Sequence, residues 1–156
     1  MDELEKFYEW YASSRPFLVP QDKAQDFIEG LTALTLYREA PFQVQLIVVS
    51  PNVVIPTHTH PNVDSFEVFL RGMVFHLNGE ILINEDQRDE RNGLSSAAAF
   101  RNIRVRPTDP HGGYAGPNGG AFLSVQHWSC EPTSVGDSWE GPHLGKRHET
   151  REGIAL

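Results

Sequence analysis

The chain has 156 residues, of which 39% are hydrophobic and 22% are charged, and its formal net charge is −8. This length predicts one domain with a proper core, and the acidic balance argues against a nucleic-acid or anionic-membrane partner, because both need a basic face. Cys130 is the single cysteine, so an internal disulfide is excluded and the fold does not need an oxidising compartment.

The N-terminal segment predicts helix. Apolar residues recur three and four positions apart within residues 2–12, at Leu4, Phe7, Tyr8 and Tyr11, which gives one apolar face. A second short helix is expected from about Gln21 to Glu29, ending before Gly30. The acidic start has no apolar run typical of a signal peptide. The longest aliphatic run, at 46–49, is far too short for a membrane span. We therefore expect a cytoplasmic protein.

The rest of the chain predicts a sheet structure. Alternating or continuously apolar runs predict strands at 31–39, 42–50, 65–72, 73–80, 80–84, 100–107 and 121–128. We expect 31–39 to pair with 42–50, and 65–72 to pair with 73–80 around Gly72. Residues 108–120 are rich in glycine and proline and predict a loop. Short strands without long helices between them are typical of an all-β sandwich or barrel.

Three histidines form a candidate metal site. His58 and His60 are two residues apart, so on a strand they face the same side and can both reach one divalent ion. A third ligand is needed, and His111 is the candidate, since it follows prolines and precedes two glycines as a residue held at a strand start would. The alternative is a polar strand edge without a metal.

These histidines carry a resemblance to the cupin superfamily. "HTHPNVDSFEVFLRG" (58–72) resembles the first cupin motif and "RVRPTDPHGG" (104–113) resembles the second. The resemblance implies a double-stranded β-helix, or jelly-roll barrel, over residues 41–130. Residues 1–40 would then be a helical segment and first strand packed on the barrel, and residues 131–156 a C-terminal arm.

The carboxylate of the first motif departs from the family pattern. Ser65 stands where the family has glutamate, and Glu67 lies two residues further on, so it faces the same way as Ser65. Asp64 should face the other way. Two interpretations remain open: a three-histidine centre, as in the thiol-dioxygenase branch of the cupins, or a site in which Glu67 takes part as a ligand or as a base.

Other polar residues are weaker candidates for ligands or pocket residues. His76, alone on its strand, is expected to be hydrogen-bonded rather than a ligand. His127 on the last strand could line the pocket. Arg71, Arg101, Arg104 and Arg106 are expected to be solvated strand residues rather than contacts for an anionic substrate.

The resemblance implies a metal-binding protein that acts on a small organic molecule. The hypothesis is a metal-dependent, dioxygenase-like enzyme with iron, manganese, nickel or zinc held by His58, His60, His111 and Glu67, and with Glu67 moving a proton. The alternatives are a cupin isomerase or lyase, and a non-catalytic cupin that binds a small molecule or serves in assembly. Exposed sheet edges favour a homodimer.

Overall fold

A computed structural model describes residues 1–14, 25–89, 93, 98–99 and 102–142 of the chain. Its elements are helix α1 (Glu3–Ser14), strands β1 (Gln25–Ile28), β2 (Leu31–Glu39), β3 (Phe42–Val49), β4 (Val54–His58), β5 (Val63–Arg71), β6 (Met73–Leu77), β7 (Glu80–Ile83), β8 (Ala98–Ala99), β9 (Asn102–Val105), β10 (His111–Ala115) and β11 (Gly120–Trp128), and the 3-10 turns η1 (Glu85–Gln87) and η3 (Val135–Asp137).

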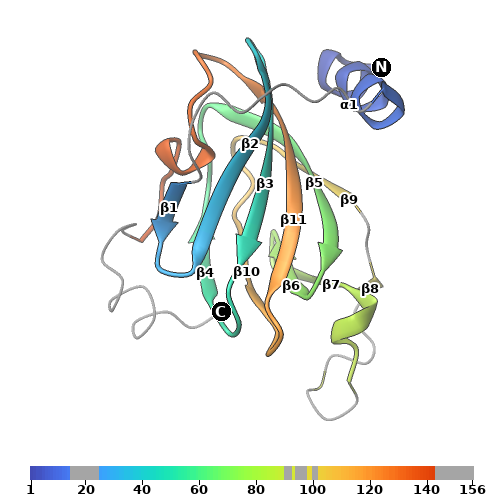
Figure 1. Cartoon of the computed structure of the whole chain (residues 1–156), viewed down its shortest axis with the longest axis vertical. Coiled ribbons are helices and arrows are strands. Elements are labelled where there is room, and N and C mark those ends of the chain that lie inside the picture. Colours follow the sequence, from blue (N-terminus) through green and yellow to red (C-terminus); the bar gives the residue numbers. More distant parts are fainter. Residues whose placement is uncertain (15–24, 90–92, 94–97, 100–101, 143–156) are drawn as a thin grey trace.

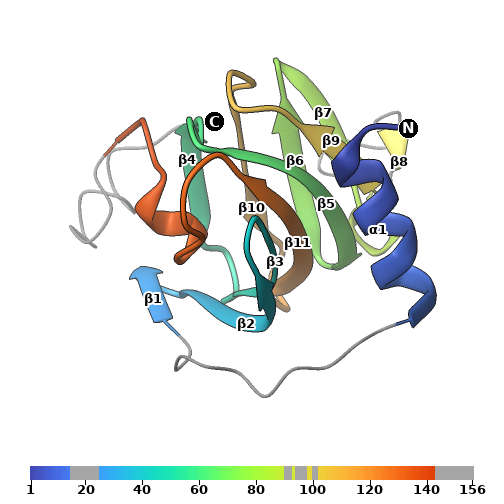
Figure 2. The same ribbon diagram turned by 90° about the horizontal axis from the view of Figure 1, so that it is seen from above.

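The strands form two sheets that face each other (Figures 1 and 2). The larger sheet has the order β1-β2-β3-β11-β5-β9 and the smaller β4-β10-β6-β7-β8. From β3 to β6 each successive strand lies in the other sheet, which is the winding of a double-stranded β-helix. The predicted all-β jelly-roll fold is therefore confirmed.

The core fills the space between the two sheets. Along β2 and β5, buried residues alternate with partly exposed ones, as expected when one face of a sheet is covered. The inward side chains include Ile47, Phe69, Phe75 and Phe122, each 7% exposed or less. The resulting interior is mainly apolar, so the polar side chains inside it stand out.

Helix α1 packs on the outer face of the larger sheet (Figure 2). Phe7 lies flat on Phe42, with ring centroids 4.3 Å apart. Arg104 on β9 donates to both oxygens of Asp64 on β5 (2.7 and 2.6 Å) and to Asp2 at the start of the helix (2.9 Å). The predicted first helix is confirmed, and its polar end is tied to the barrel.

Three expectations about local structure were wrong. Residues 25–28 of the expected second helix form strand β1, because they pair with β2; residues 21–24 lie outside the described residues. The strands on either side of Gly72 do not pair with each other: β5 pairs with β11 and β9, and β6 pairs with β10 and β7. The expected loop at 108–120 contains strand β10.

No helix among the residues described above is both long and apolar enough to cross a membrane.

Candidate metal centre

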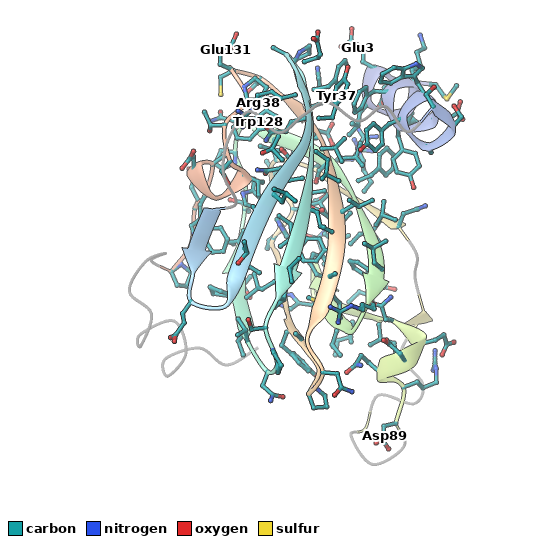
Figure 3. The ribbon with its side chains drawn as sticks, viewed as in Figure 1. Glu3, Tyr37, Arg38, Asp89, Trp128 and Glu131 are labelled. Carbon is teal, nitrogen blue, oxygen red and sulfur yellow. The ribbon has the colours of Figure 1, made fainter. Side chains whose placement is uncertain are left out.

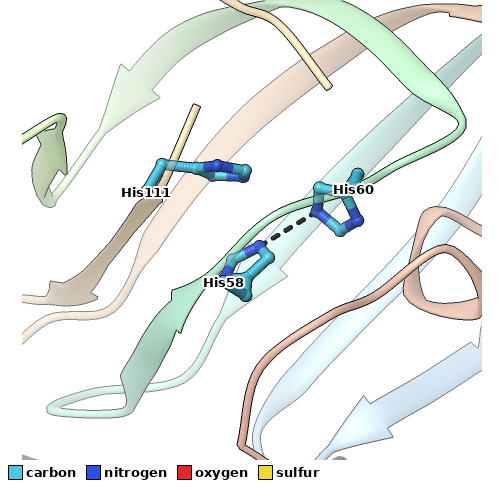
Figure 4. A group of neighbouring side chains, drawn as sticks. All are labelled: His58, His60 and His111. Atoms are coloured by element: carbon cyan, nitrogen blue, oxygen red, sulfur yellow. Dashed lines mark hydrogen bonds between the residues drawn. The ribbon is translucent and has the colours of Figure 1, made fainter. Parts of the chain in front are cut away.

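Two neighbouring strands bring the three predicted histidines together. His58 ends β4 and His111 begins β10, and the two residues are direct partners in the antiparallel register. His60 follows two residues after His58 and turns toward the same point (Figure 4). All three are buried, with exposed fractions of 5%, 8% and 3% for His58, His60 and His111.

Backbone carbonyls fix the orientation of all three rings. The Nδ1 of His58 lies 2.6 Å from the carbonyl oxygen of Pro56, and the Nδ1 of His111 lies 2.8 Å from that of Asp109. The Nδ1 of His60 bonds to the carbonyl oxygen of Ser138. A carbonyl can only accept, so each Nδ1 carries the proton and each neutral ring presents the lone pair of Nε2. This arrangement is typical of metal-binding histidines.

The free nitrogens converge as metal ligands do. One ring nitrogen of each histidine lies within 4.8 Å of the other two. The Nε2 atoms of His58 and His60 are 3.0 Å apart, although neither has a proton to donate when both rings are neutral. Two ligand atoms about 2.1 Å from one ion and at right angles are about 3.0 Å apart. The spacing therefore fits a shared cation.

A proton is poorly suited to be that cation. Burial lowers the pKa of His60 to about 3 and that of His111 to about 4. Hydrogen bonds to backbone carbonyls act in the opposite direction at both rings, as does the nearby charge of Asp109 at His111, but burial is the larger effect. Burial, with His111 and His60 close by, also holds the pKa of His58 well below its usual value. Three neutral imidazoles in one buried cluster could hold a metal ion, and nitrogen donors of this kind suit iron, manganese, nickel or zinc.

Glu67 lies in the same cavity but outside this cluster. It is 4% exposed, and its Oε1 accepts hydrogen bonds from the hydroxyls of Ser65 (3.1 Å) and Ser124 (3.2 Å). Its Oε2 is buried and has no partner. Burial raises the pKa of Glu67 to about 7, against the opposing effect of the two hydroxyls. The carboxyl is thus close to half protonated near neutral pH.

The cavity around these groups is small and mostly apolar. Its walls are formed by Leu31, Ile47, Ile55, His58, His60, Glu67, Phe75, His111, Phe122, Ser124, Val135 and Trp139. The volume within which a water molecule can be centred is about 30 Å³. About 10–15 Å³ suffices for one water. None of these wall residues is a lysine or an arginine.

The C-terminal segment supplies part of the site, which the sequence did not predict. The ring of Trp139 stacks on His58, with centroids 3.6 Å apart and planes 8° from parallel. Val135 lines the cavity, and the carbonyl of Ser138 orients His60. Residues 59 and 140 also form a β-bridge. No spacing signal could have found Ser138, because it acts through its backbone.

Other predicted polar residues lie elsewhere. His127 is outside the cavity, with its Nε2 3.4 Å from a carboxylate oxygen of Glu3. The Nε2 of His76 lies 3.4 Å from the hydroxyl of Thr57, and His76 does not line the cavity. Arg104 is engaged with acidic residues outside the barrel, and Arg101 lies outside the described residues.

Comparison with known proteins supports the fold. No protein-family model matches the sequence, and no curated protein matches it. Among solved structures, KdgF from Halomonas sp. aligns with a TM-score of 0.54 and 14% identity, over 73% of this chain and 93% of that one. An RmlC-like cupin from Shewanella frigidimarina aligns with a TM-score of 0.54 and 18% identity, over 71% and 87%.

Pac13 from Streptomyces, described as a nucleoside dehydratase, aligns with a TM-score of 0.54 and 12% identity, over 83% of this chain and 91% of that one. Identities this low support a shared fold and nothing finer. Three observations agree on the fold: the winding of the two sheets, the histidine cluster at the ends of β4 and β10, and the similarity to these solved structures. The chain has the double-stranded β-helix fold of the cupin superfamily.

Proposed function

We propose that this chain is a metal-dependent enzyme in which His58, His60 and His111 hold a divalent transition metal and Glu67 moves a proton on a small organic substrate. One observation carries the proposal: Glu67, whose Oε2 is buried without a hydrogen-bond partner, lines the same cavity as three neutral imidazoles. A carboxyl with a pKa of about 7 can both take and return a proton near neutral pH.

In this proposal the metal held by the histidines and the carboxyl of Glu67 have separate roles. A bound metal would polarise an oxygen of the substrate as a Lewis acid. Glu67 would remove a proton from the neighbouring atom and return it elsewhere on the molecule. The mostly apolar walls of the cavity favour a small substrate with few charges. This division suits an isomerase or a lyase, and the dehydratase Pac13 shows only that the same fold can host a lyase.

A dioxygenase is the second candidate. It is favoured by the ligand set itself, since the clustered ligand atoms come from three histidines and Glu67 stands apart from them. This set resembles that of the thiol-dioxygenase branch of the cupins. Such a reaction would consume oxygen, whereas an isomerase or lyase would not, so oxygen uptake separates the two.

Metal content is the first test. The protein is purified without a histidine tag and its metals are measured by mass spectrometry. We expect close to one transition-metal ion per chain, lost in His58→Ala and His111→Ala. His76→Ala is the matched control, because His76 is near the cluster but does not line the cavity. Metal content that does not change in His58→Ala would contradict the proposal.

Proton movement is the second test. The metal-loaded protein is incubated in heavy water with a panel of small hydroxy and carbonyl compounds, and deuterium incorporation at carbon is followed by NMR while oxygen uptake is recorded. We expect Glu67→Gln to keep the metal and to lose exchange. A non-catalytic binding protein would keep the metal and exchange nothing, and that result would overturn the enzymatic proposal.

A further inference from the structure

Buried polar side chains form a connected row inside the barrel and end at Glu67. The row crosses strands β2, β3, β11 and β5, and its members are Thr35, Gln43, Gln45, Gln126, Ser124 and Glu67, each 4% exposed or less. Buried amides are costly unless their hydrogen bonds are made. Here Gln126, which is fully buried, makes all four that its amide allows.

Donor-only groups fix the direction of these hydrogen bonds. The indole Nε1 of Trp128 can only donate, and it lies 2.8 Å from Oε1 of Gln126. The Nε2 of Gln126 must therefore face the other way, toward Oε1 of Gln45 (3.2 Å) and Oγ of Ser124 (3.0 Å). The backbone N–H of Val135 also donates to Oε1 of Gln45 (3.0 Å), which requires the same orientation.

A second donor-only group agrees with this direction. The Nε of Arg38 donates to Oε1 of Gln43, so the amide nitrogen of Gln43 faces Oε1 of Gln126, at 2.9 Å. Arg38 and Trp128 lie at the same end of the barrel (Figure 3). The row thus begins at that end with groups that cannot accept a hydrogen bond, and every bond along it points the same way.

The row determines which oxygen of Glu67 is free. Because the Oγ of Ser124 accepts from Gln126, its own proton is directed at Oε1 of Glu67. The hydroxyl of Ser65 donates to the same oxygen. Oε1 therefore accepts two hydrogen bonds, while Oε2 is buried without a partner. A proton on the carboxyl then belongs on Oε2.

We infer that Ser124 and Gln126 are positioning residues for Glu67: they hold Oε1 as a fixed acceptor, so that Oε2 is the oxygen that exchanges a proton with a molecule in the cavity. The inference rests on the proposed function of Glu67 and assigns the proton transfer to one of its two oxygens. In that step a proton leaves the bound molecule for Oε2, the electron pair stays on the molecule, and the proton later returns.

Infrared spectroscopy of the metal-free protein tests the role of Ser124 and Gln126 without a known substrate. Below the pKa of Glu67, the difference between wild type and Glu67→Gln contains the C=O stretch of the protonated Glu67 carboxyl. We expect Ser124→Ala to shift this band to higher wavenumber, because C=Oε1 loses one of its two donors. Ser124→Cys keeps the size of the side chain with a weaker donor, and we expect an intermediate shift.

Gln126→Met tests the next member of the row. Without the amide proton of Gln126, the Ser124 hydroxyl is free to turn, and we expect a second band near the Ser124→Ala position. Thr35→Val is the matched control, because Thr35 accepts from Gln45 (3.2 Å) on a branch that does not lead to Glu67. This variant should lose a buried hydrogen bond and leave the band in place.

Two outcomes would overturn the inference: an unmoved band in both Ser124 variants, or a band moved equally by Thr35→Val. Thermal unfolding and circular dichroism show which variants are folded, and the cysteine variant keeps the test available if Ser124→Ala does not fold. Metal content separates this inference from the proposed function. The carboxyl band of the metal-free protein tests the row of hydrogen bonds that ends at Glu67. The loss of metal in the histidine variants tests the proposed metal centre.

Discussion

The ring of His60 donates its Nδ1 proton to the backbone carbonyl of Ser138, 78 residues later in the chain. The C-terminal segment is therefore a structural part of the candidate metal centre, since an outer hydrogen-bond partner orients a metal-binding histidine. The same segment carries Trp139, which stacks on His58. Metal affinity and the position of this segment should depend on each other.

Truncation tests this dependence. A chain that ends at Ser134 lacks Ser138 and Trp139, and we expect its metal affinity to fall about 10–100-fold, the usual cost of removing an outer partner. A chain that ends at Pro142 keeps every described contact of the segment and is the matched control. Competition titrations with a chelator measure both. Equal affinities would show that the segment does not orient the ligands.

Trp139 should report metal binding directly. Its ring lies 3.6 Å from that of His58, so a paramagnetic ion such as Co²⁺ bound there should quench its fluorescence. We expect saturable quenching in wild type that is lost in Trp139→Phe. Trp10→Phe is the control, since Trp10 is 44% exposed on α1, away from the cluster. Quenching that survives in Trp139→Phe would mean that the ion binds elsewhere.

Metal binding should depend only weakly on pH. An exposed histidine site loses affinity below about pH 6.5, because protons compete for the nitrogens. In the folded chain the pKa of His60 is about 3 and that of His111 about 4, so both rings are already neutral well below that pH. We expect less than about a threefold change in Co²⁺ affinity between about pH 5 and 7. A steep loss of affinity across this range would contradict it.

The sequence predicted the fold through patterns that depend on burial alone. Strands such as β3 and β11 could be recognised because their apolar side chains face a covered surface. Strand β10 was missed because its glycines are typical of loops. A Cβ at Gly113 would lie 2.4 Å from the carbonyl oxygen of Val74, so the glycine is required by close packing between strands, which no local pattern reveals.

The candidate site could also be predicted only in part from the sequence. His58, His60 and His111 could be found from spacing, and the parity of β5 correctly predicted that Glu67 faces the same way as Ser65 and that Asp64 faces the other way. The contribution of Ser138 could not be predicted, since any residue has a carbonyl. The role of Gln126 depends on which strands become neighbours, and that order follows from the winding of the whole chain.

The passage of the chain between the sheets at Gly72 should be sensitive to substitution. Gly72 has a φ of +74°, and an added Cβ would lie 2.0 Å from the carbonyl oxygen of Gly119. We expect Gly72→Ala to lower the free energy of unfolding by more than about 3 kcal/mol, because backbone strain adds to a steric clash. Gly79→Ala is the control: its φ is +85°, but nothing lies within 4 Å.

For Gly79→Ala only the conformational cost remains, about 1–2 kcal/mol. Urea unfolding of the two variants measures the difference. If both lose the same stability, the close approach of Gly72 and Gly119 contributes nothing, and φ alone accounts for the glycine.

Glu67→Gln should stabilise the metal-free protein at high pH. Burial raises the pKa of this carboxyl from an ordinary 4.5 to about 7 in the folded state. The unfolded chain therefore releases the proton first, and wild type loses stability as the pH rises from about 4.5 through about 7 and stays less stable above. The shift corresponds to about 3 kcal/mol. Glutamine keeps an oxygen that accepts from Ser65 and Ser124 but never ionises.

We therefore expect the two proteins to have similar free energies of unfolding near pH 4.5, and Glu67→Gln to be more stable by up to about 3 kcal/mol above pH 7. Urea unfolding at both pH values measures this, and comparing the variants at one pH cancels the contribution of the histidines. A stability difference that is the same at both pH values would show that the carboxyl is not desolvated in the folded state. In that case burial would not have raised its pKa, and Glu67 would ionise like a surface residue.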